Sequence, residues 1–186
     1  KLRRERTRLA EMQDIGGLRI VSEVDLTKQD EIVKRIVDVF PITRVIDRRR
    51  RPTHGYRAVH VIATLDERLI EIQVRTQLQD LWAQAMERLA DEAGREIRYG
   101  GAPHKRGEDV ENLLNISNEI AEIEVMLTKL NLMETGLPQP RSAASRQREL
   151  RWHIAEIQSV RANLRGRERE IRAMLAALIM RVGAPK

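Results

Sequence analysis

Between Ile70 and Arg75 the chain alternates apolar and polar side chains in the order Ile-Glu-Ile-Gln-Val-Arg. In a β-strand, whose side-chain period is two, this order places the apolar residues on one face and Glu71, Gln73 and Arg75 on the other. An acid, an amide and a guanidinium in a row can hold a metal ion, orient a hydroxyl and clamp a phosphate. An ordinary half-exposed strand shows the same alternation, so this strand taken alone does not identify a site.

Four consecutive arginines, at positions 48–51, precede Pro52 and Gly55 and form a cationic segment that leads into another predicted strand. In that strand Tyr56 and His60 share one face, because they are an even number of residues apart. Arginine forks bind phosphate in a bidentate manner, so the segment suits a polyphosphate or an RNA backbone. A solvated basic loop and a structural histidine are the commoner interpretations of these residues taken by themselves.

The segment from Asp14 to Arg19 reads Asp-Ile-Gly-Gly-Leu-Arg and is a third place where chemistry is possible. An aspartate ahead of a strand can supply one oxygen to Mg²⁺, with nucleotide phosphates and water as the other ligands. The two glycines allow a ligand to approach the backbone closely. On its own, however, this pattern is most often a turn.

The composition narrows the classes of protein to which these residues can belong. The chain has 186 residues, a formal net charge of +6, no cysteine and only five aromatic residues. The absence of cysteine excludes a thiol nucleophile and a zinc–thiolate site, and the scarcity of rings disfavours a stacking platform for single-stranded nucleic acid. We find neither a bilayer-spanning apolar run nor a signal peptide, so we expect a cytoplasmic protein without a membrane partner. The basic balance favours partners that carry phosphate.

The hydrophobic pattern of the first half predicts strands intermixed with helices, which indicates an α+β fold. Helical spacing over residues 30–40 ends at Pro41, and Thr76 is placed to cap a second helix. The last two strands are separated by a segment short enough for an antiparallel hairpin. The predicted strands cover residues 15–24, 42–46, 57–64 and 68–74.

The second half of the chain has a heptad pattern instead. After a stretch with glycine and proline at 99–103, apolar residues recur at steps of three and four over 108–132, and a loop follows at 135–145. A further helix carries apolar residues at seven-residue spacing, namely Leu150, Ile157, Leu164, Ile171 and Leu178. We therefore predict a C-terminal α-helical hairpin. We divide the chain into a first domain over 1–100 and the hairpin over 101–186, which either mediates oligomerisation or partner binding or folds back onto the first domain.

Taken together, the three polar motifs are specific. The segments Asp14–Arg19, Gly55–His60 and Glu71–Thr76, followed by Trp82, occur in this order. This ordered set resembles the synthetase domain of the RelA/SpoT family, the alarmone synthetases. The resemblance covers about residues 1–95 and includes none of the hydrolase or regulatory regions of the long family members, so we expect a small, single-domain synthetase. The family's ATP site uses basic residues upstream of the aspartate motif, and we expect the N-terminal part of the domain to be incomplete here.

The resemblance implies a mixed β-sheet flanked by helices, similar to a nucleotidyltransferase. It implies a GTP/GDP pyrophosphokinase, which transfers the β,γ-pyrophosphate of ATP to the 3′-hydroxyl of GDP or GTP and makes (p)ppGpp. It also implies Mg²⁺ as the cofactor, with Asp14 and Glu71 as ligands and catalytic residues, since Glu71 would help to deprotonate the ribose hydroxyl. Tyr56 would stack on the guanine. The other nucleotide-binding residues that it implies are Arg57, His60, Gln73, Arg75, Arg19, Arg49, Arg50 and Arg51.

Two other functions stay open. One is a toxic small synthetase that acts on adenosine nucleotides or on the tRNA 3′ end. In that setting an antitoxin or a regulatory protein is a candidate partner, besides a second copy of the chain bound through the C-terminal helices. The other is a non-catalytic interaction module that binds nucleotide or RNA. Asp14 and Glu71 argue against such a module, because carboxylates beside phosphates repel unless a metal lies between them.

Overall fold

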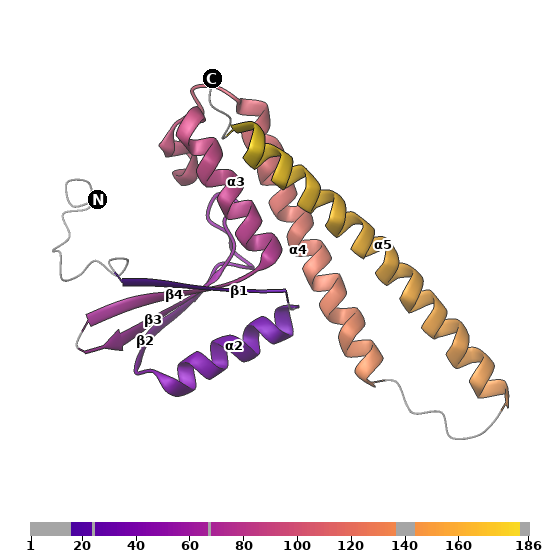
Figure 1. Cartoon of the computed structure of the whole chain (residues 1–186). Helices are drawn as coiled ribbons and strands as arrows, with labels where there is room; N and C mark the ends of the chain where they lie inside the picture. The colour runs from indigo at the N-terminus through magenta and orange to yellow at the C-terminus, as the bar shows by residue number, and fades with distance from the viewer. Residues whose placement is uncertain (1–15, 24, 67, 137–143, 183–186) are drawn as a thin grey trace.

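A computed structural model of the chain describes residues 16–23, 25–66, 68–136 and 144–182 (Figure 1). At its centre is a sheet of four strands, which are β1 (Gly16–Ser22), β2 (Ile42–Asp47), β3 (Val59–Leu65) and β4 (Arg68–Thr76). Their order across the sheet is β1-β4-β3-β2. Strand β1 is parallel to β4, whereas β3 is antiparallel to both of its neighbours. The predicted mixed sheet and the hairpin of the last two strands are confirmed.

Helix α2 (Leu26–Val39) covers one face of the sheet (Figure 1). Its first turn is capped by Asp25, whose Oδ1 accepts a hydrogen bond from the backbone N–H of Lys28 at 3.0 Å. This cap lets the helix begin earlier than its apolar spacing indicates, and the helix ends before Pro41 as predicted. Ile36 packs with apolar residues of β3 and β4 in a core between the helix and the sheet.

Helix α3 (Gln77–Ala93) directly follows β4 and lies on the opposite side of the sheet from α2 (Figure 1). Thr76 is its N-cap and forms a capping box with Gln79, which confirms the predicted cap. Trp82 is buried, and its Nε1–H donates to the carbonyl oxygen of Leu113 at 2.5 Å. This bond ties α3 to the C-terminal part of the chain. A short 3₁₀ helix, η2 (Arg95–Tyr99), follows α3.

Helices α4 (Gly107–Gly136) and α5 (Ala144–Val182) run antiparallel to each other and lie beside α3 (Figure 1). The three helices share the larger apolar core, in which Leu89, Ile120 and Ile171 are all at most 1% exposed. The C-terminal hairpin is therefore present, and it folds back onto α3. None of the described helices combines the length with the apolar composition that crossing a bilayer requires. The division of the chain into two domains near residue 100 stays a prediction.

Candidate functional site

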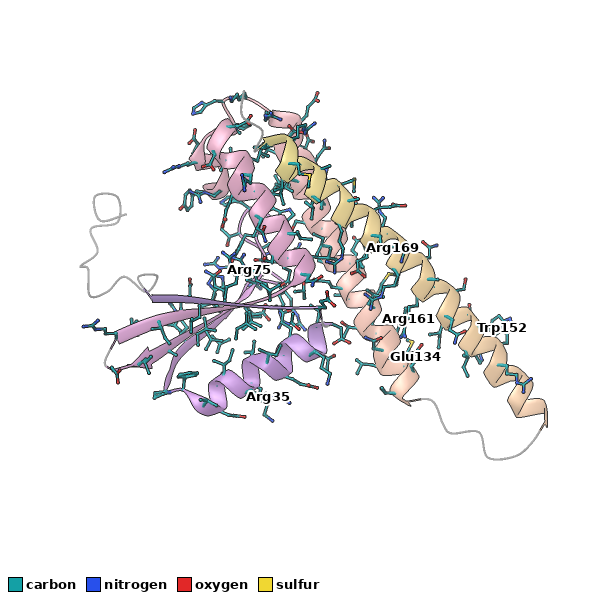
Figure 2. All side chains as sticks on the ribbon, viewed as in Figure 1. Arg35, Arg75, Glu134, Trp152, Arg161 and Arg169 are labelled. Atoms are coloured by element: carbon teal, nitrogen blue, oxygen red, sulfur yellow. The ribbon has the colours of Figure 1, made fainter. Side chains whose placement is uncertain are left out.

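The register of the sheet brings the predicted polar residues together on the face opposite α2. Gln73 of β4 pairs with His60 of β3 on one side and with Arg19 of β1 on the other. Glu71 and Arg75 share the face of Gln73, because each is two residues from it along the strand. The apolar residues between them point into the core under α2. Figure 2 shows Arg75 where the sheet meets α3.

Five of these side chains form a closed cycle of hydrogen bonds, which we call the polar ring. His60 Nδ1 lies 2.6 Å from Glu71 Oε1, and His60 Nε2 lies 2.9 Å from the Tyr56 hydroxyl. The Nη2 group of Arg75 donates to the Tyr56 hydroxyl at 2.9 Å and to Gln73 Oε1 at 2.6 Å. Gln73 Nε2 closes the ring by donating to Glu71 Oε2 at 2.8 Å. The ring therefore holds each oxygen of the Glu71 carboxylate by a separate side chain.

One arrangement of protons satisfies the hydrogen bonds of the polar ring with a neutral histidine. The Tyr56 oxygen accepts from Arg75, so its own proton is directed to His60 Nε2 at 2.9 Å rather than to Gln73 Oε1 at 3.5 Å. A neutral His60 that accepts this proton on Nε2 has its own proton on Nδ1, from which it donates to Glu71. Burial raises the pKa of Tyr56 above its ordinary value of 10.0, although the Arg75 charge opposes this effect. The phenol therefore keeps its proton at neutral pH, as this assignment requires.

Asp80 anchors the ring from α3, and our sequence analysis did not select it. Its Oδ1 accepts a hydrogen bond from Arg75 Nη1 at 2.9 Å and lies 3.4 Å from Arg19 Nη1. Its Oδ2 accepts from Gln84 Nε2 at 2.7 Å. Asp80 lies in the first turn of a helix rather than in one of the three motifs. The helical spacing gave no signal for it, because Asp80 lies on the side of the helix opposite the apolar residues Leu78 and Leu89.

The cationic segment at 48–51 brings fewer side chains to this face of the sheet than its composition predicts. Arg49 turns toward α2, where its Nη2 group lies 2.6 Å from both Asp30 Oδ1 and Asp47 Oδ2. Burial lowers the pKa of Arg49, but the hydrogen bonds and charges of the two aspartates raise it above its ordinary value. Arg50 and Arg51 are exposed. The structure therefore does not bring Arg49 to the polar ring.

Arg57 also points away from the polar ring, although it belongs to the same motif as Tyr56. Its Nε–H donates to the Ser117 carbonyl oxygen at 3.2 Å and to the Ser117 hydroxyl at 3.1 Å. Its Nη2 group donates to Asn118 Oδ1 at 3.0 Å, and its Nη1 group donates to the Arg49 carbonyl oxygen. Burial lowers the pKa of Arg57. This arginine connects the segment before β3 to α4.

The donor chemistry of the site suits a divalent cation in part. Mg²⁺ takes oxygen ligands and is often bound by one or two carboxylates together with substrate phosphates. Glu71 supplies one carboxylate, and Asp14, the other predicted ligand, lies outside the described residues. Within the described ranges, no group of three or more acidic, histidine or cysteine side chains could hold a metal ion. A metal at Glu71 would therefore depend on ligands from the undescribed segment, the substrate or water.

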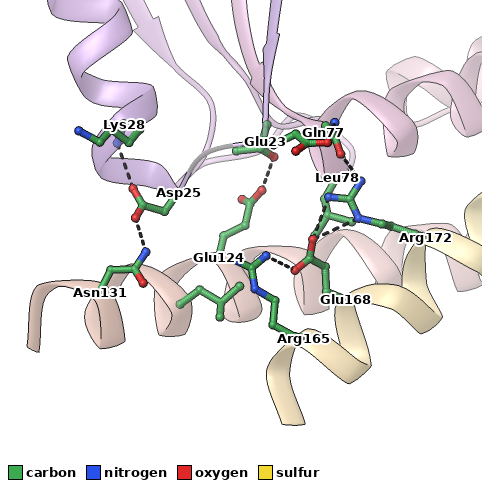
Figure 3. Close-up of a pocket in the computed structure, with 12 residues that line it drawn as sticks. Glu23, Asp25, Lys28, Gln77, Leu78, Glu124, Asn131, Arg165, Glu168 and Arg172 are labelled. Carbon is green, nitrogen blue, oxygen red and sulfur yellow. Dashed lines mark hydrogen bonds and ion pairs between the residues drawn. The ribbon is translucent and has the colours of Figure 1, made fainter. Parts of the chain in front are cut away.

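A separate pocket of about 210 Å³ lies where α2 and α3 begin beside α4 and α5 (Figure 3). Glu124 of α4 lines it and accepts hydrogen bonds from Thr76 Oγ1 and, at 2.8 Å, from Gln79 Nε2. Burial raises the pKa of Glu124, and these two bonds oppose the rise. Burial also acts to raise the pKa of Glu168, but hydrogen bonds from two arginines of α5 lower it below its ordinary value. No polar-ring residue lines this pocket.

Comparison with solved structures relates the fold to known proteins. Small alarmone synthetase 1 from Bacillus subtilis aligns with a TM-score of 0.54 and 24% identity, over 72% of this chain and 73% of that one. A GTP pyrophosphokinase family protein from Streptococcus pneumoniae aligns with a TM-score of 0.56 and 23% identity, over 75% of this chain and 73% of that one. These likenesses show the same fold, an α+β sheet with C-terminal helices.

Comparison of sequences identifies relatives and a family region. Uncharacterized proteins of Mycobacterium tuberculosis and Mycobacterium bovis are 36% identical over 159 residues, which are 84% of this chain and 52% of theirs. The chain thus spans about half the length of these curated relatives. Residues 1–90 match a family model described as a region found in RelA / SpoT proteins. This region contains all five residues of the polar ring, so the part of the chain that is similar to RelA / SpoT proteins is the part that builds the candidate site.

Proposed function

We propose that the chain is a pyrophosphokinase that transfers the β,γ-pyrophosphate of ATP to the 3′-hydroxyl of GDP or GTP. The observation that carries this proposal is the polar ring, which fixes the Glu71 carboxylate with a different partner on each oxygen. The match of residues 1–90 to the region found in RelA / SpoT proteins supports the same class of reaction. ATP and a guanosine nucleotide are accordingly the partners that we assign to the site.

Glu71 is the residue to which we assign the acceptor hydroxyl. The 3′-oxygen forms a bond to the β-phosphorus of ATP, the bond from that phosphorus to the α-phosphate oxygen breaks, and AMP leaves. Glu71 orients the hydroxyl and takes its proton as the new bond forms. Pyrophosphoryl transfer otherwise depends on positioning and on neutralising the charge of the phosphate oxygens. A covalent nucleophile is not needed for this reaction, which agrees with the absence of cysteine.

Asp14 and Glu71 would hold Mg²⁺, which would neutralise charge on the transferred phosphoryl group. This assignment follows the family motif for Asp14 and the carboxylate chemistry for Glu71. Arg19 would add positive charge beside the metal, since its side chain is 42% exposed and lies on the same sheet face. The exposed Arg50 and Arg51 would do so from the neighbouring loop.

We assign the guanine to the ring of Tyr56. The Cζ atom of Arg75 lies 5.1 Å from the centroid of the tyrosine's aromatic ring, so the guanidinium covers one face of this aromatic ring. The base would stack on the opposite face, as the family motif implies. His60, Gln73 and Arg75 would then act chiefly by fixing Tyr56 and Glu71, whereas Arg57 and Arg49 would shape the loop rather than bind the nucleotide directly.

The test is a transfer assay with γ-labelled ATP and Mg²⁺, with GDP, GTP, an adenosine nucleotide and uncharged tRNA as separate acceptors. We expect label on the guanosine nucleotides and its loss in Glu71→Gln and Asp14→Asn. Label on an adenosine nucleotide or on tRNA would replace the proposed substrate with that of a toxic synthetase. Binding of nucleotide without transfer to any acceptor, including by a longer chain with added N-terminal residues, would refute the catalytic proposal and favour a binding module.

A further inference from the structure

We infer that Asp80 is a positioning residue, which holds Arg75 and thereby fixes the Tyr56 hydroxyl and Gln73 for the acceptor nucleotide. The inference rests on the proposed function, because it assigns the acceptor base to Tyr56. Asp80 is 8% exposed and accepts the hydrogen bond from Arg75 Nη1 at 2.9 Å. It touches no other member of the polar ring by a hydrogen bond, so its effect on the ring passes through Arg75.

Arg75 depends on this contact because its guanidinium is buried. The residue is 3% exposed, and a buried cation is costly unless a counter-charge and hydrogen bonds compensate it. Its Nη2 group is the one that bridges Tyr56 and Gln73. Its Nε–H is buried and has no hydrogen-bond partner among the described residues. Asp80 therefore supplies the negative charge that keeps the Nη groups in their present directions.

The position of Asp80 is set by α3 rather than by the sheet. It follows the capping box of Thr76 and Gln79, and both of these residues also donate hydrogen bonds to Glu124 of α4. An aspartate in the first turn is further favoured by the positive end of the helix dipole. Asp80 thus connects a turn anchored in the helical part of the chain to the tyrosine at the proposed base site.

The experiment compares Asp80→Asn with a matched control, Glu124→Gln. Both changes replace a buried carboxylate by its isosteric amide next to the first turn of α3, but Glu124 makes no contact with the polar ring. We expect Asp80→Asn to raise the dissociation constant for GDP about tenfold, measured by calorimetry. We expect Glu124→Gln to leave it within about twofold. Equal GDP binding by wild type and Asp80→Asn would overturn the inference and leave the proposed function intact.

A double-mutant cycle separates positioning from a purely structural role. In a Tyr56→Phe background the hydroxyl is absent, so Asp80→Asn should weaken GDP binding by much less than tenfold. Equal losses with and without the hydroxyl would show that Asp80 does not act through it. If Asp80→Asn fails to fold, Asp80→Glu replaces it, because it keeps the charge but displaces it by one methylene. We expect Asp80→Glu to weaken GDP binding in the same way, and to do so much less in the Tyr56→Phe background.

If the wild-type chain binds no guanosine nucleotide, the proposed function is refuted. The role of Asp80 can then still be tested by a measurement that needs no nucleotide. The side-chain N–H signals of Arg75, assigned by their loss in Arg75→Lys, are followed by NMR. Asp80→Asn should make these protons exchange faster with water, whereas Glu124→Gln should not. Unchanged exchange in Asp80→Asn would show that Asp80 does not hold Arg75.

Discussion

Two glutamates show at the residue scale how surroundings decide what a carboxylate can do. Glu71 lies within reach of an imidazole and an amide on a sheet face that also carries two arginines. Glu124 is 7% exposed and receives its hydrogen bonds from uncharged groups. The surroundings of Glu71 suit an ionised carboxylate that can contact substrate, whereas those of Glu124 favour the protonated acid. Each leads to a separate prediction.

Glu71→Gln should lower the rate of pyrophosphate transfer by about 10²–10⁴-fold, the usual range for loss of a general base. The amide can still accept from one neighbour of the ring, so the dissociation constant for GDP should change far less than the rate. Rates with labelled ATP and calorimetric binding measure the two effects separately. Glu122→Gln, an exposed position on α4, is the control and should be fully active. A fully active Glu71→Gln would exclude this residue from the chemistry.

Glu124→Gln should change how stability depends on pH. Because burial raises the folded-state pKa of Glu124 above 4.5, the unfolded chain releases this proton first as the pH rises. Ionisation of Glu124 therefore destabilises the fold progressively up to the folded-state pKa and fully above it. The glutamine mimics the protonated acid, so the variant should gain stability relative to wild type at neutral pH and lose this advantage below about pH 4. Denaturant unfolding at several pH values tests this, and a constant difference would contradict it.

At the scale of elements, the loop between β2 and β3 is held against the helices by Gly55. This glycine has a φ of +82°, and an added Cβ would lie 2.6 Å from Trp82 and 2.9 Å from Leu114. Its carbonyl oxygen also accepts a hydrogen bond from Ser117 Oγ at 2.5 Å. The conformation of the segment that carries Tyr56 therefore depends on a residue without a side chain.

Gly55→Ala should destabilise the fold by about 2–4 kcal/mol, from the left-handed backbone and the overpacking together. It should also weaken nucleotide binding, because Tyr56 is the next residue. Thermal and denaturant unfolding measure the first effect. Gly17→Ala is the matched control, since its Cβ would meet nothing within 4 Å, and we expect a change in stability of less than about 0.5 kcal/mol.

Local rules predicted the elements, whereas contacts between distant segments required the structure. The period of two in β4 correctly placed Glu71 and Gln73 opposite the core, and the cap at Thr76 was also correct. The partner of Arg57 could not be predicted in this way, because Ser117 lies 60 residues further along the chain. Asp80 was missed for a related reason: it is one of several acids on its helix, and it becomes informative only once the helix is placed against the strand.

The whole molecule combines a sheet with a helical hairpin whose two arms differ in charge. Acidic residues dominate α4 and arginines dominate α5, and ion pairs such as Arg167–Glu119 at 2.6 Å join them. The part of α5 far from α3 is less covered, with Trp152 61% and Val160 44% exposed. Exposed apolar residues on a helix that projects from the body favour contact with another protein surface.

We expect this part of α5 to mediate self-association. The mass measured by light scattering or sedimentation should exceed that of one chain and fall when Trp152→Glu and Val160→Glu are combined. Arg35→Gln, at an exposed position on α2, should leave the mass unchanged. A single-chain mass for the wild type at high protein concentration would contradict self-association, and capture of a regulatory protein would then be the alternative for this surface.

The polar ring also has a fixed polarity. Arg75 has only donor groups and an ionised Glu71 only acceptors, so both branches between them run from the cation to the anion. The neutral residues along each branch cannot reverse without breaking bonds at one end. Both branches begin at the same Nη2 group of Arg75, so loss of this one cation would remove the first donor on the way to each oxygen of Glu71.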